Sequence, residues 1–318
     1  MAIASSKPGR RGGWYSLRAR ETRLAWYLIL PTALIVFGVV LFPAIFSIWI
    51  SFHDVGLKEL GNVFQAPFVG LDNYRAVIND FAFKFQGLDS WGAAVTSIVY
   101  SVVATIATIV VGLVASLLLN RRFRARGLAR AVFLFPYVAP VVSTAFVWRW
   151  ILDPRPSGVL NDVLMRIGLI DLPQAYLAER GLALLLVIVF TAWRYFPFAM
   201  LMILARLQAI DETLYEAADV DGAGEWAKFW NITIPELRYV LGALFLLRLI
   251  WTFNKFDDIW LLTGGGFGTN VLPVLTYQLS FRLNDFGRGA ANAMILFLIL
   301  IVFLVLYIGV FMRRADVE

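Results

Sequence analysis

The chain has 318 residues, of which 60% are hydrophobic and only 16% are charged, and it carries a formal net charge of +6 at pH 7. A soluble domain has roughly 45–50% apolar and about 25% charged residues, so this composition excludes an ordinary soluble protein and indicates a membrane protein. The chain contains no cysteine and a single histidine, His53, which excludes disulfides, thiol chemistry and a histidine-based metal site.

A basic tail, residues 1–23, opens the chain and leads into a first apolar run at residues 24–50. That run is far longer than the roughly 7–15 apolar residues of a signal peptide, so we expect an uncleaved anchor helix. An outer loop then extends to residue 91. Basic residues throughout the chain lie beside apolar runs, which favours contact with anionic membrane lipid and argues against nucleic-acid binding.

Five further apolar stretches follow, each long enough to cross a bilayer, which takes about 20 residues. We therefore predict an all-α polytopic membrane protein whose permease core is residues 92–312 and whose C-terminus is residues 313–318. The six predicted transmembrane helices are residues 24–50, 92–119, 128–152, 181–205, 237–262 and 289–312.

Six spans place both termini on one side of the membrane. The segments on that side, which include "NRRFRARGLAR" at 120–130, contain 16 Lys and Arg residues, against 8 in the segments on the other side. Because basic residues accumulate in cytoplasmic loops, we expect both termini and residues 206–236 to be cytoplasmic.

The segment 211–235 between the fourth and fifth spans is too charged to cross a bilayer and too apolar for an ordinary loop. Asp211 can cap a helix that ends near Gly222, where glycine accommodates a left-handed backbone. A second helix from Ala223 places Trp226, Phe229 and Trp230 on one face, and Pro235 opens the next span. Such an exposed apolar face is typical of a docking surface. The alternative is packing on its own bundle or on lipid headgroups.

The stretch "EAADVDGAGEWAKFWNITIP" resembles the EAA loop of ATP-binding-cassette importer permeases, with Ile234 at a position where that family usually has leucine. Other stretches resemble the maltose-type carbohydrate branch, first permease subunit: "FVGLDNYRAVI", "FLFPYVAPVV", "WRWILDPRPSGVLN" and "WTFNKFDDIWLLTGGG". The residues that match the loop motif are Glu216, Ala217, Ala218, Gly222, Ile232 and Pro235.

The resemblance implies that this loop is a coupling helix seated in a cleft of a separate ATPase. Glu216 makes a polar contact there, Ala217, Ala218 and Gly222 allow close approach, and we add Trp226 to the coupling residues. The implied partners are a second permease subunit, two ATPase subunits and an extracytoplasmic solute-binding protein, in a bacterial inner membrane. The chain itself is then non-catalytic and binds no cofactor, ATP and Mg²⁺ being held by the ATPases. Its sequence contains no G-x-x-x-x-G-K-[ST] phosphate loop.

Ionisable residues inside spans are costly and are functional candidates. Arg149 lies near a span end, where its side chain can reach the interface. Sugars are held by planar polar groups and aromatic rings, and "WTFNKFDD" provides both. In the resembled family this helix and the preceding one line the pore. The predicted substrate-pathway residues are Asn254, Asp257, Trp251, Tyr195, Arg194, Arg248 and, more weakly, Asn292.

The same cluster allows a structural ion pair, because Lys255 and Asp258 lie close together on the helix that we expect to continue to Gly264. If Asp257 and Asp258 neutralise Lys255 and one arginine, at most one cation is left for a ligand, which favours a neutral sugar over an anionic sugar or a glycerol phosphate. The rival functions are a secondary transporter, for which we find no convincing repeat, and a membrane enzyme.

Overall fold

The computed structural model describes residues 13–79, 92–121 and 123–315, and within these ranges the regular secondary structure is helical apart from one isolated β-bridge between His53 and Phe68. It divides into two compact units, residues 1–50 and 51–318, which are described separately. The predicted basic tail before Gly13 and the last three residues of the predicted C-terminus lie outside the described residues.

The first unit is one long helix. It comprises α1 (Gly13–Ile35), a π-helical turn η1 (Val36–Leu41) and α2 (Phe42–Ile50). Residues 21–50 form a single apolar stretch that can span a membrane, close to the predicted 24–50. The π turn immediately precedes Pro43, whose missing N–H removes a normal helical hydrogen bond, and a π turn accommodates that loss without a break.

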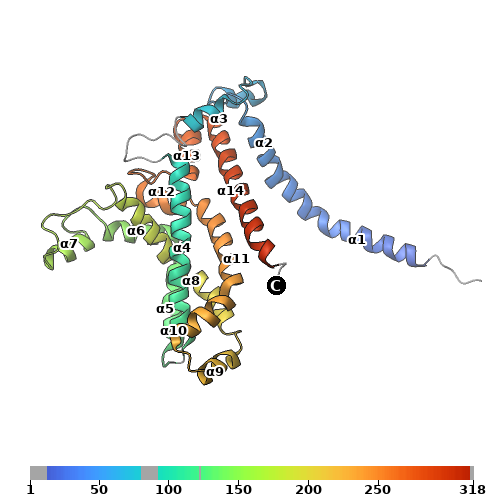
Figure 1. Cartoon of the computed structure of the whole chain (residues 1–318). Helices are drawn as coiled ribbons and strands as arrows, with labels where there is room; N and C mark the ends of the chain where they lie inside the picture. Colours follow the sequence, from blue (N-terminus) through green and yellow to red (C-terminus); the bar gives the residue numbers. More distant parts are fainter. Residues whose placement is uncertain (1–12, 80–91, 122, 316–318) are drawn as a thin grey trace, which may run out of the picture. The chain divides into compact units, whose positions relative to one another are not determined.

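The second unit begins with η2 (Glu59–Gln65) and α3 (Asp72–Val77) and is built around three long helices that lie side by side, α4 (Ala93–Asn120), α8 (Leu182–Leu207) and α11 (Ile234–Phe253) (Figure 1). The buried face of α4 consists largely of Ala, Ser, Thr and Gly. At Gly112 a Cβ atom would lie 2.6 Å from the Cβ of Ala199, so only glycine lets α4 and α8 approach this closely.

The predicted span 128–152 is wrong as a continuous helix. The structure contains α5 (Arg126–Val138) and α6 (Val141–Ile151), which meet at 95°. Pro140 provides no N–H and forces Ala139 into an extended conformation with ψ of 140°. The loop after α6 contains α7 (Val159–Arg166).

The predicted span 237–262 is also broken, because α11 ends at Phe253 and α12 (Asp257–Thr263) begins after a gap. As predicted, the helix stops at Gly264, which is left-handed with φ of +64°. The chain continues through α13 (Leu272–Tyr277), a π turn η5 (Gln278–Arg282) and α14 (Phe286–Ala315).

Among the described residues, four helices are long and apolar enough to cross a membrane, and five if the bent α5–α6 pair is one span. The structure therefore supports an all-α polytopic membrane protein, whereas the predicted count of six spans is not confirmed. The two missing spans coincide with the two predicted helices that the structure breaks.

Candidate functional site

The segment between α8 and α11 contains a short capped helix, α9 (Glu212–Val220). The N–H of Thr213 donates to Oδ1 of Asp211 at 3.0 Å, as expected for an N-cap, and this bond holds the pKa of Asp211 below its usual range. After α9, Gly222 adopts φ of +74°, which confirms the predicted left-handed glycine.

The second helix of the segment differs from the prediction in two ways. It begins at Glu225 rather than Ala223, as α10 (Glu225–Lys228), and it runs through a π turn, η4 (Phe229–Thr233), into α11 without interruption. Pro235 therefore lies in the first turn of α11 but does not open a separate helix. In the π turn the N–H of Ile234 donates to the carbonyl oxygen of Phe229, so the missing N–H of Pro235 does not break the helix.

Polar contacts fasten α9 to the continuous helix. The side chain of Lys228 is only 11% exposed, and its ammonium binds the carboxylates of Asp219 in α9 and Glu225 in α10. These contacts raise the pKa of Lys228. The hydroxyls of Tyr215 and Thr233 are hydrogen-bonded at 2.9 Å. We call the Lys228–Asp219 contact the latch; the sequence analysis did not identify it.

An apolar surface covers the outside of this segment. The exposed fractions of Val220 and Trp226 are 89% and 73%, and the rings of Trp226, Phe229 and Trp230 contact one another. The predicted coupling residues Glu216, Ala217, Gly222, Trp226 and Pro235 are exposed and Ala218 is half-buried. Ile232 instead packs into the core between α8 and α11.

A cavity of about 370 Å³ lies where α11 breaks. The break brings residues of α5, α8, α11 and α12 to one wall. Predicted pathway residues Tyr195, Arg248, Trp251, Asn254 and Asp257 all line it. Three further residues on the wall were not predicted from the sequence. Tyr137 and Phe256 carry no charge that would distinguish them from ordinary core, and Lys255 was considered only as an ion-pair partner.

Tyr195 is the centre of the polar cluster beside this cavity. The guanidinium of Arg248 and the ammonium of Lys255 lie 4.5 and 4.6 Å from the centre of its ring. Its hydroxyl donates to Oδ1 of the fully buried Asp258 at 3.4 Å. The alternative of a Lys255–Asp258 ion pair is not realised: within the described ranges, neither residue belongs to any salt bridge.

Two predicted pathway residues do not reach the cavity wall. Arg194 donates to the hydroxyl of Thr144 at 2.8 Å and to the carbonyl oxygen of Ala139 at 2.9 Å, so it holds the bend between α5 and α6. Asn292 is buried and donates to the carbonyl oxygen of Leu272 at 2.9 Å and to Thr276 at 2.8 Å.

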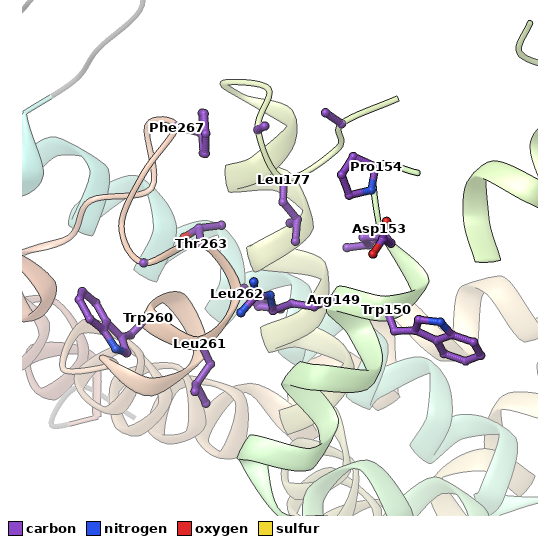
Figure 2. A pocket seen from close by; sticks show the side chains of 14 residues that line it. Arg149, Trp150, Asp153, Pro154, Leu177, Trp260, Leu261, Leu262, Thr263 and Phe267 are labelled. Carbon is purple, nitrogen blue, oxygen red and sulfur yellow. The ribbon is translucent and has the colours of Figure 1, made fainter. Parts of the chain in front are cut away.

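A second, larger pocket of about 690 Å³ adjoins the other end of α12 (Figure 2). Arg149 and Trp150 of α6 and Leu177 and Phe267 of the loops line it, together with Trp260–Thr263 of α12. Asp257, at the start of the same helix, lines the smaller cavity. The short helix α12 therefore contributes to both hollows.

Comparison with known proteins identifies the family of this chain. Residues 108–315 match the family described as "Binding-protein-dependent transport system inner membrane component". This chain belongs to that family. Its membrane location follows from this membership and from the apolar helices described above.

The chain is similar to several known permeases. The inner membrane ABC transporter permease protein YcjO of Escherichia coli is 34% identical over 277 residues, covering 87% of this chain and 90% of that one. The trehalose/maltose transport system permease protein MalF of Thermococcus litoralis is 32% identical, covering 94% and 97%. The trehalose transport system permease protein SugA of Mycobacterium tuberculosis is 28% identical, covering 88% and 86%.

The fold is also similar to a solved structure, that of a bacterial ABC transporter involved in the import of the acidic polysaccharide alginate. The TM-score is 0.73 at 20% identity, with 96% of this chain and 99% of that chain covered. At this identity the likeness concerns the fold alone.

Proposed function

We propose that the chain is the permease subunit of an ATP-driven importer that passes a carbohydrate delivered by an extracytoplasmic binding protein. The observation that carries this proposal is the similarity, over almost the whole length of both chains, to permeases named for trehalose and maltose transport. It agrees with the predicted carbohydrate function.

The cavity at the break of α11 suits a sugar. Trp251 and Phe256 offer aromatic faces to the apolar side of a sugar ring, and Asn254 and Asp257 offer planar polar groups to its hydroxyls. Trp251 is 42% exposed, and its ring contacts that of Phe198 in a tilted arrangement. We propose these residues as the substrate contacts.

The segment 211–235 is the proposed coupling element. A rigid, fastened loop with an exposed apolar face is suited to receive force from a partner, and Glu216 and Ala217 lie exposed on it. The partners in this proposal are two ATPase subunits, which bind ATP and Mg²⁺, a second permease subunit and the binding protein. The chain itself catalyses no reaction, and both of its termini face the cytoplasm.

Reconstitution tests the proposal. The chain is co-purified with its ATPase and second permease, placed in liposomes, and supplied with binding protein and labelled trehalose or maltose. ATP-dependent uptake is expected, and the chain alone should hydrolyse no ATP. Asn254→Ala should reduce uptake several-fold, since a lost hydrogen bond costs about 0.5–1.5 kcal/mol, while basal ATP hydrolysis persists. ATP hydrolysis by the isolated chain, or uptake without ATP, would contradict the proposal.

A further inference from the structure

The cavity at the break of α11 has an excess of positive charge. Arg248 and Lys255 line it, against one carboxylate, Asp257. Behind the wall, the buried Asp258 interacts with Lys255, Arg194 and Arg248 together, so three cations stand against two carboxylates around Tyr195. Within the described ranges, no carboxylate lies within salt-bridge distance of Arg194, Arg248 or Lys255.

The two cations on the wall are only partly compensated. Arg248 is 1% exposed, donates one hydrogen bond of 3.3 Å to the hydroxyl of Thr252, and leaves its Nε without a partner. Lys255 is half-buried, and the one contact of its ammonium in the described structure is with the ring of Tyr195. An aromatic ring stabilises a cation less than a carboxylate does, so the cavity keeps a positive potential that its low-dielectric surroundings strengthen.

The exposure of these charged groups determines which of them can contact a ligand in the cavity. Arg248 lines the cavity but is only 1% exposed, so its charge acts on the cavity mainly through its field and less through direct contact. Lys255 can contact a ligand directly. Asp257 is exposed on the same wall and opposes an anion.

We infer that the transported sugar carries an anionic group, a carboxylate or a phosphate, which is received by the ammonium of Lys255. The inference rests on the proposed function and narrows its substrate class. It replaces the expectation of a neutral sugar, which depended on ion pairs that the structure does not contain. Because a carboxylate and a phosphate offer the same charged oxygens, both sources are tested.

The experiment uses the complete reconstituted transporter with its binding protein. Thermal shift of the binding protein and ATP-dependent uptake are measured in parallel with three probes: trehalose, trehalose 6-phosphate and a glucuronic-acid disaccharide. At least one anionic probe should stabilise the binding protein and be transported in preference to trehalose. Which of the two succeeds distinguishes a phosphate from a carboxylate.

Variants then locate the effect. Lys255→Gln should lower uptake of the anionic probe by about tenfold or more, the usual loss for a hydrogen bond between charged groups. Lys255→Arg, which keeps the positive charge, should restore most of it. Arg238→Gln, which removes the same charge at the far end of α11, is the matched control and should transport normally.

Three results would overturn the inference. Uptake of trehalose but of neither anionic probe would overturn the inference and leave the proposed function standing. Equal uptake by Lys255→Gln and Arg238→Gln would show that the lysine receives no anion. Absence of ATP-dependent uptake of every sugar would overturn the proposed function and this inference with it.

Discussion

At the scale of single residues, the buried cation Arg194 is fixed by its hydrogen bonds. Arg194 lies in the middle of α8, where an unsatisfied cation is costly. It binds the carbonyl oxygen of Ala139, which the bend at Pro140 leaves at the open end of α5. A cation from one helix thereby stabilises the exposed backbone of another.

We therefore expect Arg194→Gln to destabilise the protein without changing its apparent affinity for substrate. The change removes two hydrogen bonds made by a charged donor, which corresponds to about 3–6 kcal/mol. Thermal unfolding in detergent and the KM of ATP-dependent uptake are the two measurements. A raised KM with unchanged unfolding would instead place Arg194 in the substrate pathway, as the sequence analysis predicted.

The latch is a second residue-scale device. The contacts of Lys228 raise its pKa. The stability that the latch gives the folded segment is therefore fully present below the ordinary lysine pKa of about 10.4 and is lost only at still higher pH. The latch is thus intact at every physiological pH. Asp219→Asn should increase hydrogen exchange of the α9 amides between pH 6 and 8. Glu225→Gln removes a contact within α10 alone and should leave α9 protected. Equal exchange in both variants would show that the latch does not hold α9.

At the scale of elements, the turn between α9 and α10 depends on one glycine. Gly222 has a left-handed backbone with open space around it, whereas the nearby Gly224 has φ of −72°, which any residue adopts. The two positions differ in conformation and not in room for a side chain. The same substitution at both therefore isolates the conformational requirement.

Gly222→Ser should weaken assembly with the ATPase and lower uptake, because a side chain in the left-handed region costs about 1–2 kcal/mol. Gly224→Ser should be neutral or slightly stabilising, since serine is a preferred N-cap for α10. Co-purification of the ATPase and uptake measure both. Normal coupling in Gly222→Ser would remove the support for this turn as part of the docking element.

At the scale of the whole molecule, the absence of cysteine permits a direct test of topology. Val220 in the segment 211–235 is 89% exposed, and Leu172 in the loop after α7 is 71% exposed. With cytoplasmic termini, a membrane-impermeant maleimide should label Leu172→Cys in spheroplasts and label Val220→Cys only after permeabilisation. The reverse pattern would invert the proposed orientation.

The sequence predicts those helices well in which apolar residues continue without a break. The bounds of α4 and α8 differ from their predicted spans by a few residues at most. It fails where the backbone turns inside a predicted span, at Ala139–Pro140 and at Asn254–Phe256. Proline was visible at the first place, yet a proline in a membrane helix can kink it slightly or break it, and only the surrounding hydrogen bonds decide.

The candidate cavity was predicted in part for a related reason. Charged and polar residues stand out in an apolar span, so Arg248, Asn254 and Asp257 were nominated and do line the wall. Tyr137 could not be found in this way, because an aromatic residue there resembles ordinary core. Asn292 was nominated on its polarity alone, whereas its amide is used within the core. The assumed pairing of Asp257 and Asp258 with nearby cations was wrong, because the distances between these side chains depend on where α11 ends.

The uninterrupted path from α10 through η4 to α11 has a mechanical consequence. Residues 225–253 form one rod, with Trp226 exposed near one end and Trp251 on the cavity wall near the other. At 1.5 Å per residue the rod is about 40 Å long, so a tilt of about 5° displaces its tip by roughly 3–4 Å. A sugar hydroxyl held at hydrogen-bonding distance is released by less than that. In the proposed mechanism, a small rotation of this rod at its Trp226 end would be amplified, by lever length alone, into a movement of the cavity wall large enough to release the sugar.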